Sequence, residues 1–250
     1  MEGENMSLKD TYRFVLYGDS ISKGVIYDEQ KKKYIVLDEN FPALLQNKLK
    51  GIIYNVAKFG NTLIRAIGKL PNEVLKKNPD VVIIEFGGND CDFDWEQIAE
   101  NPDGIHNPKT DFNVFQRLLR NLIDTLNRNG IIPVLLTLPP IDADKYFKWI
   151  SKNSAAVGEK ILKWLGSVTK IYWWQERYNS AIVSIANETK TRLIDIRSSF
   201  LKHPDYREFL CLDGIHPNRQ GHRIIADRIY EYIKTHCSFL LKDDYSPENV

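Results

Sequence analysis

The chain has 250 residues, of which 43% are hydrophobic and 27% are charged, the balance of an ordinary globular protein. Its 34 Lys and Arg residues are nearly matched by 33 Asp and Glu residues. The resulting net charge of +1 argues against a nucleic-acid-binding protein and against a preference for anionic membranes. This length fits a single domain over residues 1–250, with a core at about 11–236.

The chain ends and the cysteines give expectations about the cellular location of the protein. Residues 1–10 are polar, so we expect no secretory signal, and the polar tail from 242 to 250 is expected to fray. No stretch reaches the roughly 20 apolar residues that span a bilayer, so we expect no integral membrane association. Cys91, Cys211 and Cys237 have no close CxxC spacing, which predicts reduced thiols in a cytoplasmic protein.

Short apolar runs alternate with longer amphipathic stretches along the chain. The runs expected as strands are 14–17, 52–56, 81–86, 131–138 and 192–196. The stretches expected as helices are 41–49, 64–77 with a break near Pro71, 112–129, 178–189 and 220–236. We expect the triple lysine at 31–33 to lie in a solvated loop. This alternation predicts an α/β fold, a parallel sheet with helices on both faces.

In such a sheet the chemistry belongs at the carboxyl ends of the strands. Four polar clusters fall in loops of that kind. They are Gly18-Asp19-Ser20, Phe59-Gly60-Asn61, Gly87-Gly88-Asn89-Asp90 and Asp213-Gly214-Ile215-His216. Because different parts of the chain deliver small and polar residues to one edge, we expect a functional site there.

Ser20, His216 and Asp213 are the residue types of a nucleophilic triad. A serine hydroxyl needs a base to remove its proton, and a histidine oriented by a carboxylate is the usual base. The three-residue spacing of Asp213 and His216, with a glycine between them, would let the carboxylate reach Nδ1 while Nε2 faces Ser20. The alternative for the Asp-Ser pair is a helix cap, and for the Asp213 turn a surface turn leading into a helix.

Gly60 and Asn89 are candidate donors to an oxyanion. A glycine offers an unobstructed backbone N–H, and an asparagine offers a side-chain amide. Taken separately, Gly60 could be a left-handed turn position and Asn89 an Asx turn. We expect Asp19 and Asp90 to hold their loops by hydrogen bonds.

With these motifs in this order, the sequence resembles the SGNH/GDSL hydrolase superfamily across about residues 13–233. The four residues of the family name are present as Ser20, Gly60, Asn89 and His216, while Ile21 replaces the leucine of the GDSL signature. The resemblance implies a flavodoxin-like three-layer α/β/α fold. It also implies a Ser20–His216–Asp213 triad and an oxyanion hole formed by the N–H groups of Ser20 and Gly60 with the Asn89 side chain.

The segment between Pro140 and Tyr178 is longer than a simple connection requires and is rich in aromatic residues. We interpret 140–178 as a lid or specificity insertion, because long loops on such scaffolds often carry specificity. Its tryptophans are candidate substrate contacts: Trp149, Trp164, Trp173 and Trp174. The alternative is an added helical hairpin whose aromatics pack on the sheet.

Two other classes of protein compete with a serine esterase. A two-metal phosphoesterase would need more His and Asp ligands than the chain offers, so we expect neither metal nor cofactor. A carbohydrate- or nucleotide-binding module would not need a triad, and phosphate-binding glycine motifs are absent. Among esterase substrates, a small-molecule ester such as a carbohydrate O-acetyl ester comes first. Another short acyl ester or thioester comes second, and a lysophospholipid third.

Overall fold

The computed structural model describes residues 9–242. The first eight residues, and all of the predicted tail except Lys242, lie outside the described residues. Within the described part, no helix is both long enough and apolar enough to cross a membrane.

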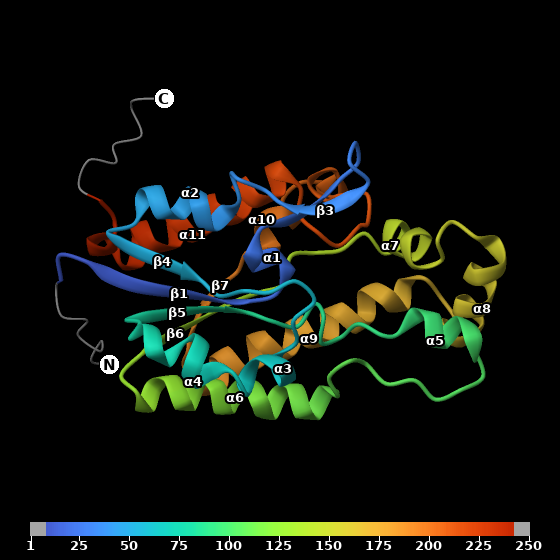
Figure 1. The fold of residues 1–250 in the computed structure, drawn as a ribbon, viewed down its shortest axis with the longest axis horizontal. Helices are drawn as coiled ribbons and strands as arrows, with labels where there is room; N and C mark the ends of the chain where they lie inside the picture. Colours follow the sequence, from blue (N-terminus) through green and yellow to red (C-terminus); the bar gives the residue numbers. More distant parts are fainter. Residues whose placement is uncertain (1–8, 243–250) are drawn as a thin grey trace.

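A five-stranded parallel sheet forms the middle layer of the molecule (Figure 1). Its strands are β1 (Tyr12–Gly18), β4 (Gly51–Asn55), β5 (Val81–Glu85), β6 (Ile132–Leu136) and β7 (Arg192–Ile194). They lie in the order β4-β1-β5-β6-β7. The second of these strands along the chain therefore lies outside the first, as in flavodoxin-like sheets, and the predicted fold class is confirmed.

Helices cover both faces of the sheet (Figure 1). On one face lie α3 (Leu63–Ile67), α4 (Leu70–Glu73), α6 (Phe112–Arg128) and α9 (Thr169–Thr189). On the other lie α2 (Phe41–Lys48), α10 (Arg197–Leu201) and α11 (Arg219–His236). Side chains of β1 alternate between the two layers, because successive residues of a strand point to opposite faces. Val15 and Tyr17 pack in the first layer, and Phe14 and Leu16 in the second.

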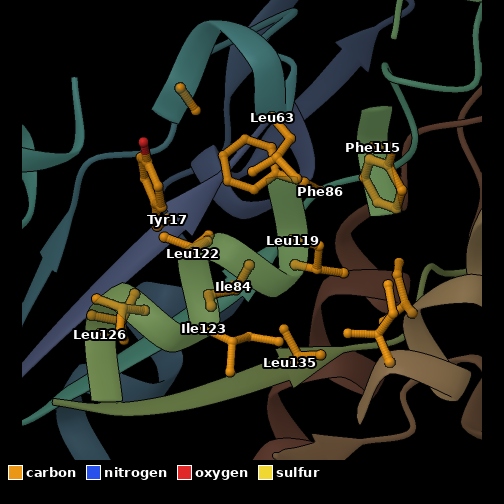
Figure 2. Packing of buried hydrophobic residues seen from close by; sticks show 14 of the residues in the cluster. Tyr17, Leu63, Ile84, Phe86, Phe115, Leu119, Leu122, Ile123, Leu126 and Leu135 are labelled. Carbon is orange, nitrogen blue, oxygen red and sulfur yellow. The ribbon is translucent and has the colours of Figure 1, made fainter. Parts of the chain in front are cut away.

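Helix α6 illustrates how the layers are held together. Its buried side chains recur at helical spacing and are Phe115, Leu119, Leu122, Ile123 and Leu126. Figure 2 shows them packed with Ile84 and Leu135 of the sheet. Burial of each such side chain stabilises the fold by about 1.5–3 kcal/mol.

A third group of elements lies beyond the carboxyl ends of the strands (Figure 1). It contains α5 (Trp95–Glu100), α7 (Ala143–Ile150), α8 (Ala155–Leu165) and the first turns of α9, which share a separate apolar cluster. The segment 140–178 is thus mainly helical, and α9 begins nine residues before the predicted start at Tyr178. Its helices pack mostly on one another and on α5, because their aromatic side chains bury best among themselves.

The remaining elements are short. β2 (Val25–Asp28) and β3 (Lys33–Val36) form an antiparallel hairpin. The triple lysine is exposed, as expected: Lys31 and Lys32 lie in the turn of the hairpin, and Lys33 is the first residue of β3. One-turn helix α1 (Ser20–Lys23) precedes the hairpin. Three 3₁₀ turns complete the described elements: η1 (Leu75–Lys77), η2 (Tyr206–Phe209) and η3 (Ser238–Leu240). The hairpin reaches the carboxyl edge of the sheet, where Tyr34 of β3 packs against the ring of His216.

Candidate active site

Ser20 lies at the sharp turn where β1 ends and α1 begins. Asp19 caps α1, since its Oδ1 accepts a hydrogen bond from the N–H of Ile21 at 2.9 Å. Gly24 ends the helix after one turn in the left-handed region, at φ 86°. The cap expected as the alternative is therefore present, but Asp19 provides it, and the Ser20 hydroxyl is left to face His216.

Ser20, His216 and Asp213 form one hydrogen-bonded series. Nε2 of His216 lies 2.8 Å from Oγ of Ser20, and Nδ1 lies 2.6 Å from Oδ2 of Asp213. Both distances are those of hydrogen bonds, and the first joins residues 196 positions apart in the chain. All three side chains are buried, with exposed fractions of 5%, 4% and 0% in the order named.

The Asp213 carboxylate is stabilised in its charged form. Burial alone acts to raise its pKa, but hydrogen bonds from the His216 ring and from backbone N–H groups outweigh burial and hold the pKa below its ordinary value. The backbone donors are the N–H groups of Ile215 and His216, each 3.1 Å from Oδ1. A carboxylate so held fixes the histidine tautomer that leaves Nε2 free to accept the serine proton.

Backbone hydrogen bonds from two other segments hold the loop that carries His216. The N–H of Cys211 donates to the carbonyl of His216, and the N–H of Asp142 donates to the carbonyl of Gly214, both at 2.8 Å. Gly214 has φ 76°, and a Cβ there would lie 2.7 Å from the Asp142 carbonyl oxygen. The start of the 140–178 segment therefore packs directly against the histidine loop, at a position where only glycine fits.

The candidate oxyanion donors line the same cavity as Ser20 and His216. Ser20 is the first residue of α1, so its N–H has no acceptor within the helix. Gly60 has φ 66°, and a Cβ at this position would have no neighbouring atom within 4 Å. Nδ2 of Asn89 donates one hydrogen bond to Oδ2 of Asp19 at 2.9 Å, which leaves its second N–H for the cavity.

Asp90 ties two of these loops together, as expected from the sequence. Its Oδ1 accepts hydrogen bonds from the N–H of Leu63 at 2.9 Å and from Oγ1 of Thr110 at 2.6 Å. Burial raises the pKa of Asp90 to about 7. The turn that contains Gly60 is thereby fixed to the loop that contains Asn89.

The cavity has a volume of about 690 Å³, large enough for a small organic substrate. Of the four tryptophans expected to contact substrate, Trp149 and Trp174 line it. Trp164 packs instead on Phe93, with ring centroids 5.0 Å apart. Trp173 is 52% exposed and lies outside the cavity wall, because neighbouring residues of a helix point in different directions.

The sequence interpretation missed an aromatic group around the histidine. The Tyr34 ring lies 5.2 Å from the His216 ring, and Phe59 stacks on His216 with centroids 6.1 Å apart. Tyr34 and Tyr27, both on the hairpin, also contact Trp149 at 6.1 and 4.7 Å. Burial and then the Asp213 charge raise the pKa of Tyr34. Short β-branched runs on both sides of the polar segment 28–33 were the available signal.

Within the described residues, no group of three or more His, Cys, Asp or Glu side chains could hold a metal ion. The fold and the site together define a flavodoxin-like α/β protein with a hydrogen-bonded serine, histidine and aspartate at the carboxyl edge of its sheet.

Comparison with known proteins adds the family. The model of the GDSL-like lipase/acylhydrolase family matches residues 16–224, most of the chain. The chain therefore belongs to this family. It is 27% identical over 158 residues to the GDSL esterase/lipase CPRD49 of Arabidopsis thaliana, a match that covers 62% of this chain and 55% of that protein. The chain thus spans about half the length of the curated relatives it matches.

Solved structures share the fold at low identity. The lipase/acylhydrolase from Enterococcus faecalis superposes with a TM-score of 0.65 at 20% identity, covering 94% of this chain and all of that one. Axe2, an acetylxylan esterase from Geobacillus stearothermophilus, gives a TM-score of 0.63 at 20% identity, covering 91% and 96% of the two chains. Together with the family match over residues 16–224, this shared fold confirms the predicted resemblance to the SGNH/GDSL superfamily.

Proposed function

We propose that the protein is a carboxylic ester hydrolase that works through an acyl-enzyme on Ser20. The observation that carries the proposal is the unbroken hydrogen-bonded series from Ser20 through His216 to Asp213. It lies in a cavity that Gly60 and Asn89 also line.

In the first half-reaction, Nε2 of His216 takes the hydroxyl proton of Ser20 while Oγ attacks the ester carbonyl carbon. The tetrahedral oxyanion receives hydrogen bonds from the backbone N–H groups of Ser20 and Gly60 and from the Asn89 amide. His216 then returns the proton to the alkoxide, which leaves as an alcohol when the C–O bond breaks. Asp213 stabilises the imidazolium formed in between.

In the second half-reaction, water replaces the alcohol. His216 removes a proton from this water, and the hydroxide attacks the acyl carbon. The second oxyanion that forms accepts hydrogen bonds from the same donors. Collapse breaks the bond to Oγ, His216 returns the proton to Ser20, and the free acid leaves. Because the same base serves both halves, one histidine position is sufficient.

For the substrate, we propose a short acyl ester of a carbohydrate alcohol. The leaving oxygen must come within hydrogen-bond reach of Nε2 of His216, so the alcohol part lies beside the rings of Tyr34, Phe59 and Trp149. Aromatic faces can pack against a sugar ring while leaving its hydroxyls hydrated. The fold-level similarity to a protein named an acetylxylan esterase agrees with this choice.

The test is hydrolysis of a p-nitrophenyl ester series of increasing acyl length, run beside acetylated sugars. The wild type should release acetate from sugars and favour the shortest p-nitrophenyl esters. Ser20→Ala should lower kcat by about 10⁴–10⁶-fold. The exposed Ser180→Ala is the matched control and should keep the wild-type rate.

Two results separate mechanism from substrate. A Ser20→Ala protein with more than about a tenth of the wild-type rate would remove Ser20 from the chemistry. A preference for long acyl chains, as in a lysophospholipase, would contradict the substrate class and leave the mechanism standing. A thioester preferred over its oxygen ester would do the same. The cytoplasmic location stays a prediction, checked by fractionating cells that produce the full chain.

A further inference from the structure

Two carboxyl groups meet beneath the site, and the proposed mechanism uses neither. Glu85 is the last residue of β5, and Asp19 precedes the nucleophile. Their exposed fractions are 0% and 1%. Glu85 can lie so close to the serine turn because Gly18 has no Cβ. A Cβ there would lie 2.5 Å from the Glu85 carbonyl oxygen and 2.6 Å from Oγ of Ser22.

The hydrogen bonds of Glu85 are incomplete if it is ionised. Oγ of Ser22 donates to Oε2 of Glu85 at 2.9 Å. Oε1 is buried and has no donor within residues 9–242. A buried acceptor without a partner is costly, whereas a proton on Glu85 turns the same carboxyl into a donor. The carboxylate that can accept this hydrogen bond is that of Asp19.

Asp19 joins this pair to the catalytic groups. Its Oδ1 accepts from the N–H of Ile21, and its Oδ2 accepts from Nδ2 of Asn89, each at 2.9 Å. The first bond fixes the turn that holds Ser20. The second consumes one amide hydrogen of Asn89 and so sets the direction of the other. The position of Asp19 therefore decides where Asn89 points.

The charges around the pair favour a single negative charge. Within the described chain, neither carboxylate has an ion pair with Lys or Arg. The nearby titratable groups are Asp90, which is another acid, and His216 on the serine side. Burial raises the pKa of both Asp19 and Glu85, and the Asp19 charge raises that of Glu85 further, well above its ordinary value.

We propose that Glu85 carries a proton and donates it in a hydrogen bond to Asp19, and that this bond positions the Asn89 amide for the oxyanion. The inference rests on the proposed esterase function. Glu85 is a positioning residue, because it acts through Asp19 and does not touch the reacting atoms. The proton also keeps a second negative charge away from the place where the oxyanion forms.

The proton itself can be observed without any activity. The infrared difference spectrum between wild type and Glu85→Gln, recorded at about pH 8, should contain the C=O band of a protonated carboxyl. Glu39→Gln, an exposed glutamate, is the matched control and should give only carboxylate bands. A difference spectrum between wild type and Glu85→Gln that lacks the protonated band would overturn the proposal, even if the protein proves to be an active esterase.

The positioning role is tested by kinetics. Glu85→Gln keeps a donor for Asp19 and an acceptor for Ser22, so its kcat should stay within about threefold of wild type. Glu85→Leu removes both the donor and the acceptor and should lower kcat by about 10–100-fold with little change in KM. This loss of kcat is smaller than the loss expected when Asn89→Ala removes the amide itself. Circular dichroism checks that each variant folds.

A double-mutant cycle isolates the route through Asn89. In an Asn89→Ala background, Glu85→Leu should cause no further loss of kcat, since the group it positions is gone. An equal loss in both backgrounds would show that Glu85 does not act through Asn89 and would overturn the positioning role. If the wild type hydrolyses no ester, the proposed function fails, while the infrared result still decides the state of Glu85.

Discussion

His222 makes the stability of the fold depend on pH in a way that can be calculated. It lies on α11 six residues after His216, fully buried, with its ring stacked on Phe41 at a centroid distance of 5.9 Å. Burial lowers its pKa from 6.5 to about 4. Between these two values the unfolded chain binds a proton that the folded protein excludes, so the free energy of unfolding falls as the pH falls.

The difference between the pKa values of 6.5 and about 4 corresponds to about 3 kcal/mol of unfolding free energy. The folded protein loses this whole amount of stability only below pH 4. Asp90 acts in the opposite direction, since its raised pKa makes the folded protein bind the extra proton below about 7. The net pH dependence of the wild-type stability therefore combines His222, Asp90 and the other buried acids whose pKa values are shifted. The difference between wild type and a His222 variant isolates the histidine.

The assay is urea unfolding, followed by tryptophan fluorescence, at several pH values between about 7 and 4. In wild type, His222 should lower the free energy of unfolding by about 3 kcal/mol as the pH falls, and we expect His222→Phe to remove most of this fall. Repacking around the phenylalanine costs about 1–3 kcal/mol, but this cost is the same at every pH. His236→Gln, an exposed histidine on the same helix, should keep the wild-type slope. If the unfolding free energies of wild type and His222→Phe changed with pH by the same amount, the reasoning would be refuted.

Three further predictions concern the site. Asp213→Asn should lower kcat by about 10⁴-fold, because the wrong His216 tautomer would be favoured, and a loss below about tenfold in steady-state kinetics would argue against the role. Asn89→Ala should lower kcat by about 10²–10³-fold with a smaller change in KM, whereas a change confined to KM would reassign the residue to substrate binding. Trp149→Ala should alter relative kcat/KM among sugar and p-nitrophenyl acetates, while the exposed Trp173→Ala should not. Equal effects of the two tryptophan variants would contradict the assignment of the cavity wall.

The sheet and the polar clusters were predictable because they follow from short-range patterns. Strands such as β5 are buried on both faces and read as continuous apolar runs. Parallel strands bring their carboxyl ends to one edge, so the serine and asparagine loops could be placed near each other without coordinates. The Asp213–His216 contact was also within reach, since both residues lie in one turn.

Long-range packing was not predictable in the same way. The contact of Tyr34 with His216 depends on how the β2–β3 hairpin is oriented against the rest of the fold, and no local sequence pattern determines that orientation. Likewise Trp173 and Trp174 are adjacent in sequence, yet only Trp174 lines the cavity, because the rotation of α9 about its axis is set by tertiary packing. Glu85 read as part of an apolar strand, and its partner Asp19 comes from another strand end.

The central claim, that Ser20 is a nucleophile activated by His216, is tested most directly by a fluorophosphonate probe and peptide mass spectrometry. The account predicts one stoichiometric adduct on the peptide that contains Ser20, suppressed by an ester substrate, much slower in His216→Ala and absent in Ser20→Ala. An adduct on a different residue, or ester hydrolysis by a wild-type protein whose Ser20 stays unlabelled, would contradict it.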